Sequence, residues 1–205
     1  MNVVLLGKGD LSIKVAEYCK EYFNLSLVIP DKPEPKWTGS LQNWCIDNNV
    51  PYIESGDFKD LDEGCKFDLG ISIFYGKIIK KGFIDKCEKI INLHNAPLPK
   101  YRGVRPINWA LKNNEKYHGI TIHEITEGID DGPIVGKLTY PIYPEIEEVD
   151  DVYRKSLDYG WLLFKDVISK IGYAYSNSLI QDNSKSSYYS NKEIKDLGNR
   201  LDFKR

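Results

Sequence analysis

The sequence predicts an α/β protein in which residues 1–175 form one domain around a doubly wound, mostly parallel sheet, with a polar extension over 176–205. Short apolar runs typical of buried strands alternate along the chain with segments of helical periodicity. The run over 67–74 is mostly apolar, as expected of a strand covered on both faces. The first run ends in Gly7-Lys8-Gly9 and a helical pattern follows it, which is a common opening of α/β folds.

The strands are expected where apolar or alternating runs end at turn residues. Pro30 stops the second run, and 118–124 alternates apolar with polar residues, as in a half-buried strand. The run over 134–142 is expected to be its hairpin partner. The expected strands are 2–6, 25–29, 50–53, 67–74, 89–93, 118–124 and 134–142.

Four helices are expected from apolar spacing. The first follows Gly9 and places Ile13, Ala16 and Cys19 near helical spacing, and others cover 41–48, 106–113 and 152–171. Proline suits the first helical position at 106, and 152–171 has the strongest helical pattern. In the Ser/Asn/Lys-rich extension, Leu179-Ile180 and Tyr188-Tyr189 are the expected anchors to the domain or to a partner subunit.

Bulk composition excludes several classes of function. The 205 residues carry a net charge of −2, so the chain lacks the basic surface expected for binding nucleic acid or an anionic membrane. No apolar run approaches the roughly 18 residues of a spanning helix, and no signal peptide is evident. The four cysteines are scattered without metal-ligand spacing, which favours reduced thiols in a cytoplasmic protein.

The Gly7-x-Gly9 turn weakly resembles a dinucleotide-binding motif. Position 12 is serine where the motif needs its third glycine, and Asp31 comes too early for a ribose-binding acid. The turn is therefore expected to be a tight connection at the carboxyl edge of the sheet, with amides available to an anionic group.

The three histidines differ in context. His94 follows a strand and precedes a Pro-x-Pro loop, which places it at the carboxyl edge of the sheet, where ligands bind. His123 lies in the polar register of its strand and is a weaker candidate, and His118 is expected at the surface. No motif for a serine or cysteine nucleophile is present, and no second histidine or cysteine stands at metal-ligand spacing from His94.

Asn92, His94 and Asp130 together form a plausible set for acyl transfer without a covalent enzyme intermediate. An amide can donate to a developing oxyanion, an imidazole can move a proton, and a carboxylate can orient that imidazole. Taken alone, Asp131-Gly132 predicts only a hairpin turn. It is the occurrence of Asp130 together with Asn92 and His94 that favours a catalytic role over a simple turn.

That pattern resembles the catalytic domain of formyltransferases that use 10-formyltetrahydrofolate. The resemblance covers about residues 1–145 and departs from the common pattern at Asn95 and Asp131. Its motifs are Phe74-Tyr75-Gly76-Lys77-Ile78-Ile79, Asn92-x-His94, Leu98-Pro99-x-Tyr101-Arg102-Gly103, Gly119-Ile-Thr-Ile-His123 and Gly128-Ile-Asp130-x-Gly132-Pro133-Ile134.

The resemblance implies the site residues, with 10-formyltetrahydrofolate as co-substrate, no metal, and 1–175 as the catalytic domain. Asn92, His94 and Asp130 are the implied catalytic residues. The implied folate-binding residues are Tyr75, Gly76, Lys77, Ile78, Ile79, Glu124, Thr126, Gly128 and Asp130. The expected acceptor-binding residues are Lys8, Gly9, Asp10, Asn95, Tyr101, Arg102 and Arg105, although Arg102 could instead bond the carbonyls of its own loop.

The run from Pro99 to Ala110 and the Tyr188-Tyr189 pair are similar to enzymes that formylate amino sugars on nucleotide carriers. This likeness implies a cytoplasmic enzyme of lipopolysaccharide O-antigen biosynthesis, with a homodimer left open. Glycinamide ribonucleotide transformylase is the alternative, and a non-catalytic folate- or nucleotide-binding domain is a weaker one. Methionyl-tRNA formyltransferase is disfavoured, because the chain has no room for a C-terminal RNA-binding barrel and lacks its basic charge.

Overall fold

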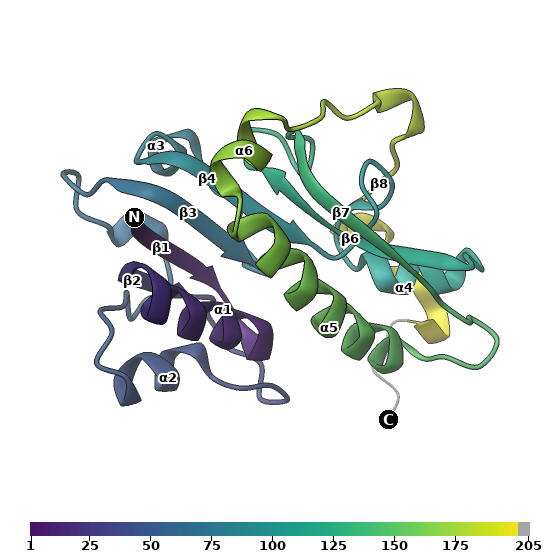
Figure 1. The fold of residues 1–205 in the computed structure, drawn as a ribbon. Helices are drawn as coiled ribbons and strands as arrows, with labels where there is room; N and C mark the ends of the chain where they lie inside the picture. Colours follow the sequence, from purple (N-terminus) through teal and green to yellow (C-terminus); the bar gives the residue numbers. More distant parts are fainter. Residues whose placement is uncertain (201–205) are drawn as a thin grey trace. The chain divides into compact units, whose positions relative to one another are not determined.

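The computed structural model describes residues 1–200 and divides into two compact units (Figure 1). The first unit comprises Met1–Leu93 and Glu124–Glu127, and the second comprises His94–His123 and residues 128–200. Each unit has a hydrophobic cluster of its own. Among the described residues, no helix is long and apolar enough to cross a membrane.

A parallel sheet with strand order β2-β1-β3-β4 forms the first unit. Leu5 lies opposite Ile71, and Ile71 lies opposite Ile91, all at most 1% exposed. The apolar runs that predicted strands are therefore buried, as parallel sheets require. The strands are β1 (Asn2–Gly7), β2 (Asn24–Pro30), β3 (Phe67–Ile73) and β4 (Cys87–His94).

Helical segments cover the sheet of the first unit on both faces. Helix α1 (Gly9–Tyr22) contacts β1, β2 and α2 (Leu41–Asp47). Alternate residues of a strand face opposite sides, and Val4 and Leu6 pack in one cluster with Phe58 and Phe83. Those two phenylalanines come from the 3₁₀ helix η1 (Phe58–Asp60) and from α3 (Lys81–Ile84). The predicted doubly wound α/β class is confirmed.

An antiparallel hairpin and two helices build the second unit. Strand β6 (Tyr117–Glu124) pairs with β7 (Ile134–Pro141). Residues from α4 (Pro106–Lys112) and α5 (Val149–Ile168) share one hydrophobic cluster with the hairpin. Tyr140 of β7 stacks on Tyr159 of α5 with ring centroids 4.5 Å apart.

Most predicted elements are present with shifted ends. The helix predicted over 152–171 begins earlier, at Val149, because Glu148 and Asp151 form a capping box, and a separate helix α6 (Ile171–Ser176) follows it. The strand predicted over 50–53 is wrong. Tyr52 forms only an isolated bridge with Val28, and the preceding residue, Pro51, has no N–H to donate to a ladder.

The C-terminal segment lies against its own chain in the second unit (Figure 1). Strand β8 (Tyr188–Tyr189) pairs in parallel with β5 (Arg102–Gly103), and the Tyr189 ring stacks on Trp109 at 4.3 Å. Leu179 bonds to Ile134 through its backbone while its side chain is 69% exposed. Two 3₁₀ segments complete the described part, η2 (Asn183–Lys185) and η3 (Asn191–Arg200), and the last five residues of the predicted extension lie outside it.

The expected apolar anchors of this segment are therefore only partly correct. Ile180 is 90% exposed and Tyr188 is 52% exposed, whereas Tyr189 and Leu197 join the hydrophobic cluster of the second unit. Backbone pairing, rather than the Leu179-Ile180 side chains, holds the first part of the segment.

Candidate active site

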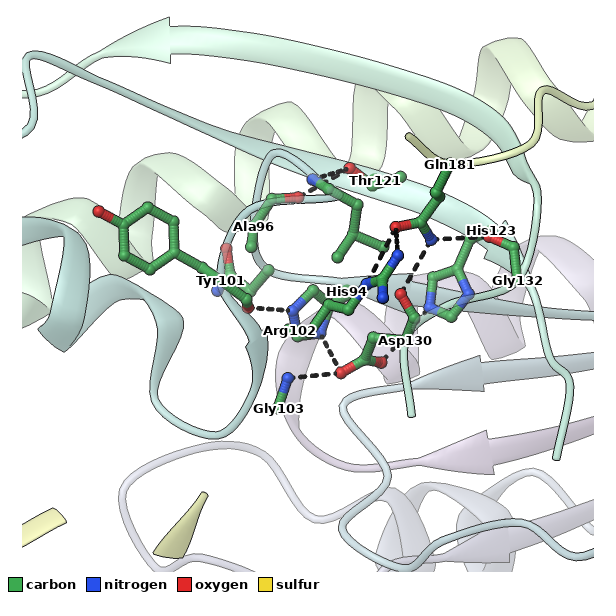
Figure 2. Close-up of polar contacts among 12 residues, drawn as sticks. His94, Ala96, Tyr101, Arg102, Gly103, Thr121, His123, Asp130, Gly132 and Gln181 are labelled. Atoms are coloured by element: carbon green, nitrogen blue, oxygen red, sulfur yellow. Dashed lines mark hydrogen bonds and ion pairs between the residues drawn. The ribbon is translucent and has the colours of Figure 1, made fainter. Parts of the chain in front are cut away.

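His94 and Asp130 lie side by side in the second unit (Figure 2). His94 Nδ1 is 3.5 Å from Asp130 Oδ2, and His94 Nε2 is 2.9 Å from the carbonyl oxygen of Tyr101. Because a carbonyl oxygen can only accept, Nε2 donates in that hydrogen bond. Both ring nitrogens thus face acceptors, so an imidazolium satisfies both and a neutral ring satisfies one. The ring is thus oriented by Asp130 on one side and by the Tyr101 carbonyl on the other.

Two more groups converge on the Asp130 carboxylate. The Gly103 amide donates to Oδ2 at 2.8 Å, and His123 Nε2 is 3.5 Å from Oδ1. Burial raises the pKa of Asp130, but the charge of His94, the hydrogen bond and charge of His123 and the Gly103 amide outweigh it. The pKa of this carboxyl therefore lies well below its usual range, and Asp130 is ionised at neutral pH.

The loop after His94 is fixed by side chains of the hairpin. Thr121 Oγ1 donates to the carbonyl of Ala96 at 2.7 Å and accepts from the amide of Leu98 at 3.1 Å. Lys137 Nζ donates to the carbonyl of Leu98 at 3.1 Å. These bonds satisfy buried backbone groups, and they set the path of the chain from His94 toward Tyr101.

Asn95 and Tyr101, two of the expected acceptor-binding residues, are buried in the second unit. Asn95 Nδ2 donates to Ser156 Oγ at 2.9 Å, and the Tyr101 hydroxyl donates to Glu115 Oε1 at 2.8 Å. Burial raises the pKa of Tyr101, so its phenol stays protonated. Tyr101 reaches His94 through its backbone carbonyl.

The two expected arginines have different surroundings. Arg102 donates through Nε and Nη2 to Gln181 Oε1, at 3.1 and 2.7 Å, and through Nη2 to Asn183 Oδ1 at 2.9 Å. Its partners are side-chain amides of the C-terminal segment rather than carbonyls of its own loop. Arg105 is exposed and precedes α4 with a left-handed backbone, φ 54°.

His118 is fully buried, so its expected place at the surface is wrong. It lies in β6 between the rings of Tyr101 and Tyr140, and its Nε2 donates to the carbonyl of Asn95 at 2.9 Å. A position near the start of a strand indicates exposure only when one face of the strand is solvated. Burial lowers the pKa of His118 to about 4, with a further lowering from His94 and an opposing effect of the bond to Asn95.

We expect His118 to make folding sensitive to acid. Between pH 6.5 and about 4 the unfolded chain binds a proton at this residue that the folded chain excludes, so stability is full above 6.5 and falls with pH. The loss of unfolding free energy should reach at most about 3 kcal/mol near pH 4. His118→Gln keeps a donor for Asn95 without titrating, so this slope should shrink in denaturant titrations across that range. Parallel pH dependences of the two proteins would contradict the assignment.

In the first unit, Asp31 ties the glycine turn after β1 to the segment after β3. Its Oδ2 is 2.5 Å from Lys8 Nζ and 3.1 Å from the Gly76 amide. Gly9 has φ 76°, the left-handed region that favours glycine. Asp10 is exposed, and its Oδ1 accepts from the Gly39 amide at 2.8 Å. Asp31 therefore has a structural role, and Lys8 has a buried carboxylate as its partner.

The segment Tyr75–Ile79 is anchored in the first unit at both ends. The Tyr75 hydroxyl and Lys77 Nζ each donate to the carbonyl of Gly56 at 2.8 Å. Ile79 is 6% exposed and packs in the same hydrophobic cluster as Tyr75 and Ile125, whereas Ile78 is 51% exposed. The segments expected to hold the folate are 75–79 and 124–130, and residues of the first (Tyr75, Ile79) and Ile125 of the second contribute to one cluster.

The other expected site residues lie on β4 and around the end of β6. Asn92 is on β4 opposite Ser72 of β3. Glu124 is the last residue of β6, Thr126 follows in the first unit, and Gly128 begins the next stretch of the second unit. Within residues 1–200, no group of three or more His, Cys, Asp or Glu side chains could hold a metal ion.

Three parts of the site had little or no sequence signal. His123 lay in the polar register of its strand, which was compatible with this position without indicating it. The Gly103 amide and the Tyr101 carbonyl are backbone groups, so residue types do not reveal them. Gln181 Nε2 donates to the carbonyls of Asp130 and Gly132 from about fifty residues further along the chain.

An α/β fold with a histidine–carboxylate pair at the end of a buried strand fits the class of enzymes that use general acid–base catalysis. Residues 56–168 match the model of the formyl transferase family, and the chain belongs to that family. The methionyl-tRNA formyltransferase of Thermosipho melanesiensis is 32% identical, covering 99% of this chain and 68% of its own length. That of Fervidobacterium nodosum is 29% identical, covering 96% and 66%. The chain thus spans about two thirds of these curated relatives.

Two solved structures are similar over most of the chain. WlaRD, a sugar 3N-formyl transferase in the presence of dTDP and 5-N-formyl-THF, is 30% identical with a TM-score of 0.82, covering 94% of this chain and 70% of that one. An N-formyltransferase from Helicobacter canadensis, in complex with folinic acid and dTDP-3-aminofucose, is 29% identical with a TM-score of 0.81, covering 94% and 72%.

Proposed function

We propose that this protein transfers the formyl group of 10-formyltetrahydrofolate to the amine of a nucleotide-linked amino sugar. The contact of His94 with Asp130 carries the formyl-transfer part of the proposal, because it supplies an oriented, titratable ring beside a carboxylate held ionised. The likeness to two sugar N-formyltransferases over 94% of the chain supports the acceptor class. We further propose that this enzyme is cytoplasmic and acts in O-antigen synthesis.

The residues of β4 and Asp130 suit the steps of this reaction. The unprotonated amine attacks the formyl carbon, and the formyl oxygen becomes an oxyanion. Asn92 Nδ2 can donate to this oxyanion, and so can His94 Nε2 when it exchanges the Tyr101 carbonyl for it. The bond from the formyl carbon to N10 of the folate then breaks. The amine loses one proton and N10 gains one, so the reaction consumes no net proton. Asp130, through His94 or a water molecule, carries that proton.

The proposed folate residues are Tyr75 to Ile79 with Glu124, Thr126, Gly128 and Asp130. The shared packing of Tyr75, Ile79 and Ile125 supports a common role for the two segments of the first unit. The same segment contains Ile78, whose side chain is exposed, and Gly76, whose backbone amide donates to Asp31. A flat aromatic ring system such as a pterin suits apolar side chains flanked by backbone groups.

The proposed acceptor residues are Lys8, Gly9, Asp10, Asn95, Tyr101, Arg102 and Arg105. Arg102 and Arg105 are the proposed partners for a diphosphate, and the Arg102 guanidinium also donates to Gln181 and Asn183. Exposure of the Arg105 side chain is compatible with a role at the surface of an acceptor site. Guanidinium groups bind phosphate oxygens through paired donors.

Arg105→Gln should raise the KM of a diphosphate-linked acceptor about tenfold and leave kcat within about twofold, as expected when a charge-assisted bond of uniform strength is lost. Steady-state kinetics with the acceptor varied would measure both constants. Lys100→Gln is the matched control, since Lys100 is a cation of the same loop that pairs with Glu115 at 3.6 Å. If the Arg105 variant and the control had equal KM values for the acceptor, the assignment of Arg105 to the acceptor site would be wrong.

Methionyl-tRNA is the second candidate acceptor, favoured by the 32% identity to a methionyl-tRNA formyltransferase over nearly the whole chain. The deciding experiment supplies 10-formyltetrahydrofolate with a panel of nucleotide-linked amino sugars, methionyl-tRNA and glycinamide ribonucleotide. Appearance of tetrahydrofolate with an amino sugar alone supports the proposal. Turnover only with methionyl-tRNA or glycinamide ribonucleotide would replace it, and binding of folate without turnover of any acceptor would favour a non-catalytic domain.

A further inference from the structure

Gln181 links the loop that carries Asp130 to the loop that carries Gly103 (Figure 2). Its Nε2 donates to the carbonyl oxygen of Asp130 at 2.9 Å and to that of Gly132 at 2.7 Å. Its Oε1 accepts two hydrogen bonds from Arg102. One side-chain amide thus uses both of its donor hydrogens and both of its acceptor positions.

The partners fix the orientation of this amide. Arginine has only donors, so Oε1 has to face Arg102, and the two carbonyl oxygens only accept, so Nε2 has to face them. If the amide were flipped, its NH₂ group would face the Arg102 donors and its oxygen would face the two carbonyl oxygens, so all four hydrogen bonds would be lost. Gln181 is 6% exposed, which makes an unmet bond here costly.

The two loops joined by Gln181 set the position of the histidine–carboxylate pair. Three consecutive residues of one loop contribute: the Tyr101 carbonyl binds His94, the Arg102 side chain binds Gln181, and the Gly103 amide binds Asp130 Oδ2. On the other loop, Asp130 has a left-handed backbone, φ 51°, which is strained for a residue other than glycine. The bond from Gln181 to the Asp130 carbonyl holds the residue in this conformation.

Apolar packing of the C-terminal segment does not explain why Gln181 is buried. The preceding Leu179 and Ile180 are 69% and 90% exposed, so the apolar side chains beside Gln181 bury little surface. Apart from the backbone pairing of Leu179 with Ile134, the contacts of the segment at this point are the hydrogen bonds of Gln181. A polar side chain that is buried while its apolar neighbours are exposed indicates a role for its hydrogen bonds.

We infer that Gln181 is a positioning residue, which aligns the Asp130 carboxylate with His94 for proton transfer, and that the C-terminal segment thereby completes the active site. This inference rests on the proposed function for its kinetic consequences. Gln181 is not among the proposed folate or acceptor residues. Its loss should therefore act on kcat, because a displacement of about 1 Å at a catalytic group can cost about 10²-fold in rate.

The kinetic test compares three variants with the best acceptor of the panel. Gln181→Met keeps the length of the side chain without its bonds, and Gln181→Glu keeps an acceptor for Arg102 but cannot donate to the two carbonyls. Both should lower kcat about 10- to 100-fold with both KM values within about threefold. Asn183→Ala, the control, removes another amide partner of Arg102 and should keep kcat within about twofold. An active Gln181→Glu, or an equal loss in Asn183→Ala, would overturn the inference.

A measurement without substrate separates this inference from the proposed function. The Gly103 amide donates to an ionised carboxylate, so its proton resonance should lie downfield in the wild type and move upfield in both Gln181 variants, with faster hydrogen exchange. It should be unchanged in Asn183→Ala. An unchanged Gly103 amide in both Gln181 variants refutes positioning, whatever the acceptor is. Failure of every amino sugar as acceptor refutes the proposed function and leaves this test valid.

Discussion

His94→Ala should lower kcat for formyl transfer by about 10²–10³, with much smaller changes in KM and no change of fold. The ring is the one titratable group proposed to act both on the formyl oxygen and on the transferred proton, and loss of either role alone costs at least about 10²-fold. Its contacts with Asp130 and the Tyr101 carbonyl leave it pre-oriented, so alanine removes a positioned group and not a mobile one. Tetrahydrofolate release with saturating acceptor measures the effect.

The matched control is His118→Gln, which changes a buried histidine that bonds Asn95 and has no proposed contact with substrate. At pH 7 it should retain most of the wild-type kcat. Near-normal turnover of His94→Ala with the best acceptor would show that the assigned chemistry is wrong, whichever acceptor is used.

Asp130→Asn should have a comparable effect on kcat, about 10²–10³, although it preserves the size of the side chain. The amide removes the negative charge that faces both His94 and His123. The exposed neighbour provides the control, because Asp131→Asn changes the same charge one residue away and should keep kcat within about twofold. Equal losses in the two variants would assign the effect to the loop as a whole.

The same substitution should change how stability depends on pH. The folded pKa of Asp130 lies below the unfolded value of 3.8, so its ionisation stabilises the fold above pH 3.8 and this contribution is lost as pH falls through the folded pKa. Wild type should therefore be more stable than Asp130→Asn at pH 7, with the gap narrowing only below about pH 4. Denaturant titrations at pH 7, 5 and 3.5 would reveal this trend. A gap that closes between pH 7 and 5 would contradict an ionised Asp130 over that range.

Local chemistry explains what the sequence predicted well. Strand β1 is an almost continuous apolar run, and the buried positions of β3 and β4 are mostly apolar, as expected of strands in a parallel sheet. The helix α5 carries a long apolar stripe, so only its ends differed from expectation. The juxtaposition of His94 and Asp130 also followed from the sequence, through its resemblance to a family with the same spacing.

The features that were missed depend on contacts between distant backbone groups. Gln181 is one polar residue in a polar segment, and its partner carbonyls at 130 and 132 have no signature in residue type. Strand β8 has two residues and pairs with another two-residue strand, too short for a periodic pattern. His118 stands in an alternating strand whose two faces are both covered, so alternation did not indicate exposure.

The pairing of β5 with β8 has a consequence for protein engineering. A Cβ at Gly103, where φ is 91°, would collide with the carbonyl of Tyr189, so this loop and this segment fit only as a matched set. Exchanging the loop 95–105 between relatives, as in efforts to redirect acceptor choice, should therefore fail unless residues 179–189 are exchanged with it. The two stretches therefore have to be exchanged together, although about eighty residues of chain separate Arg102 from Gln181.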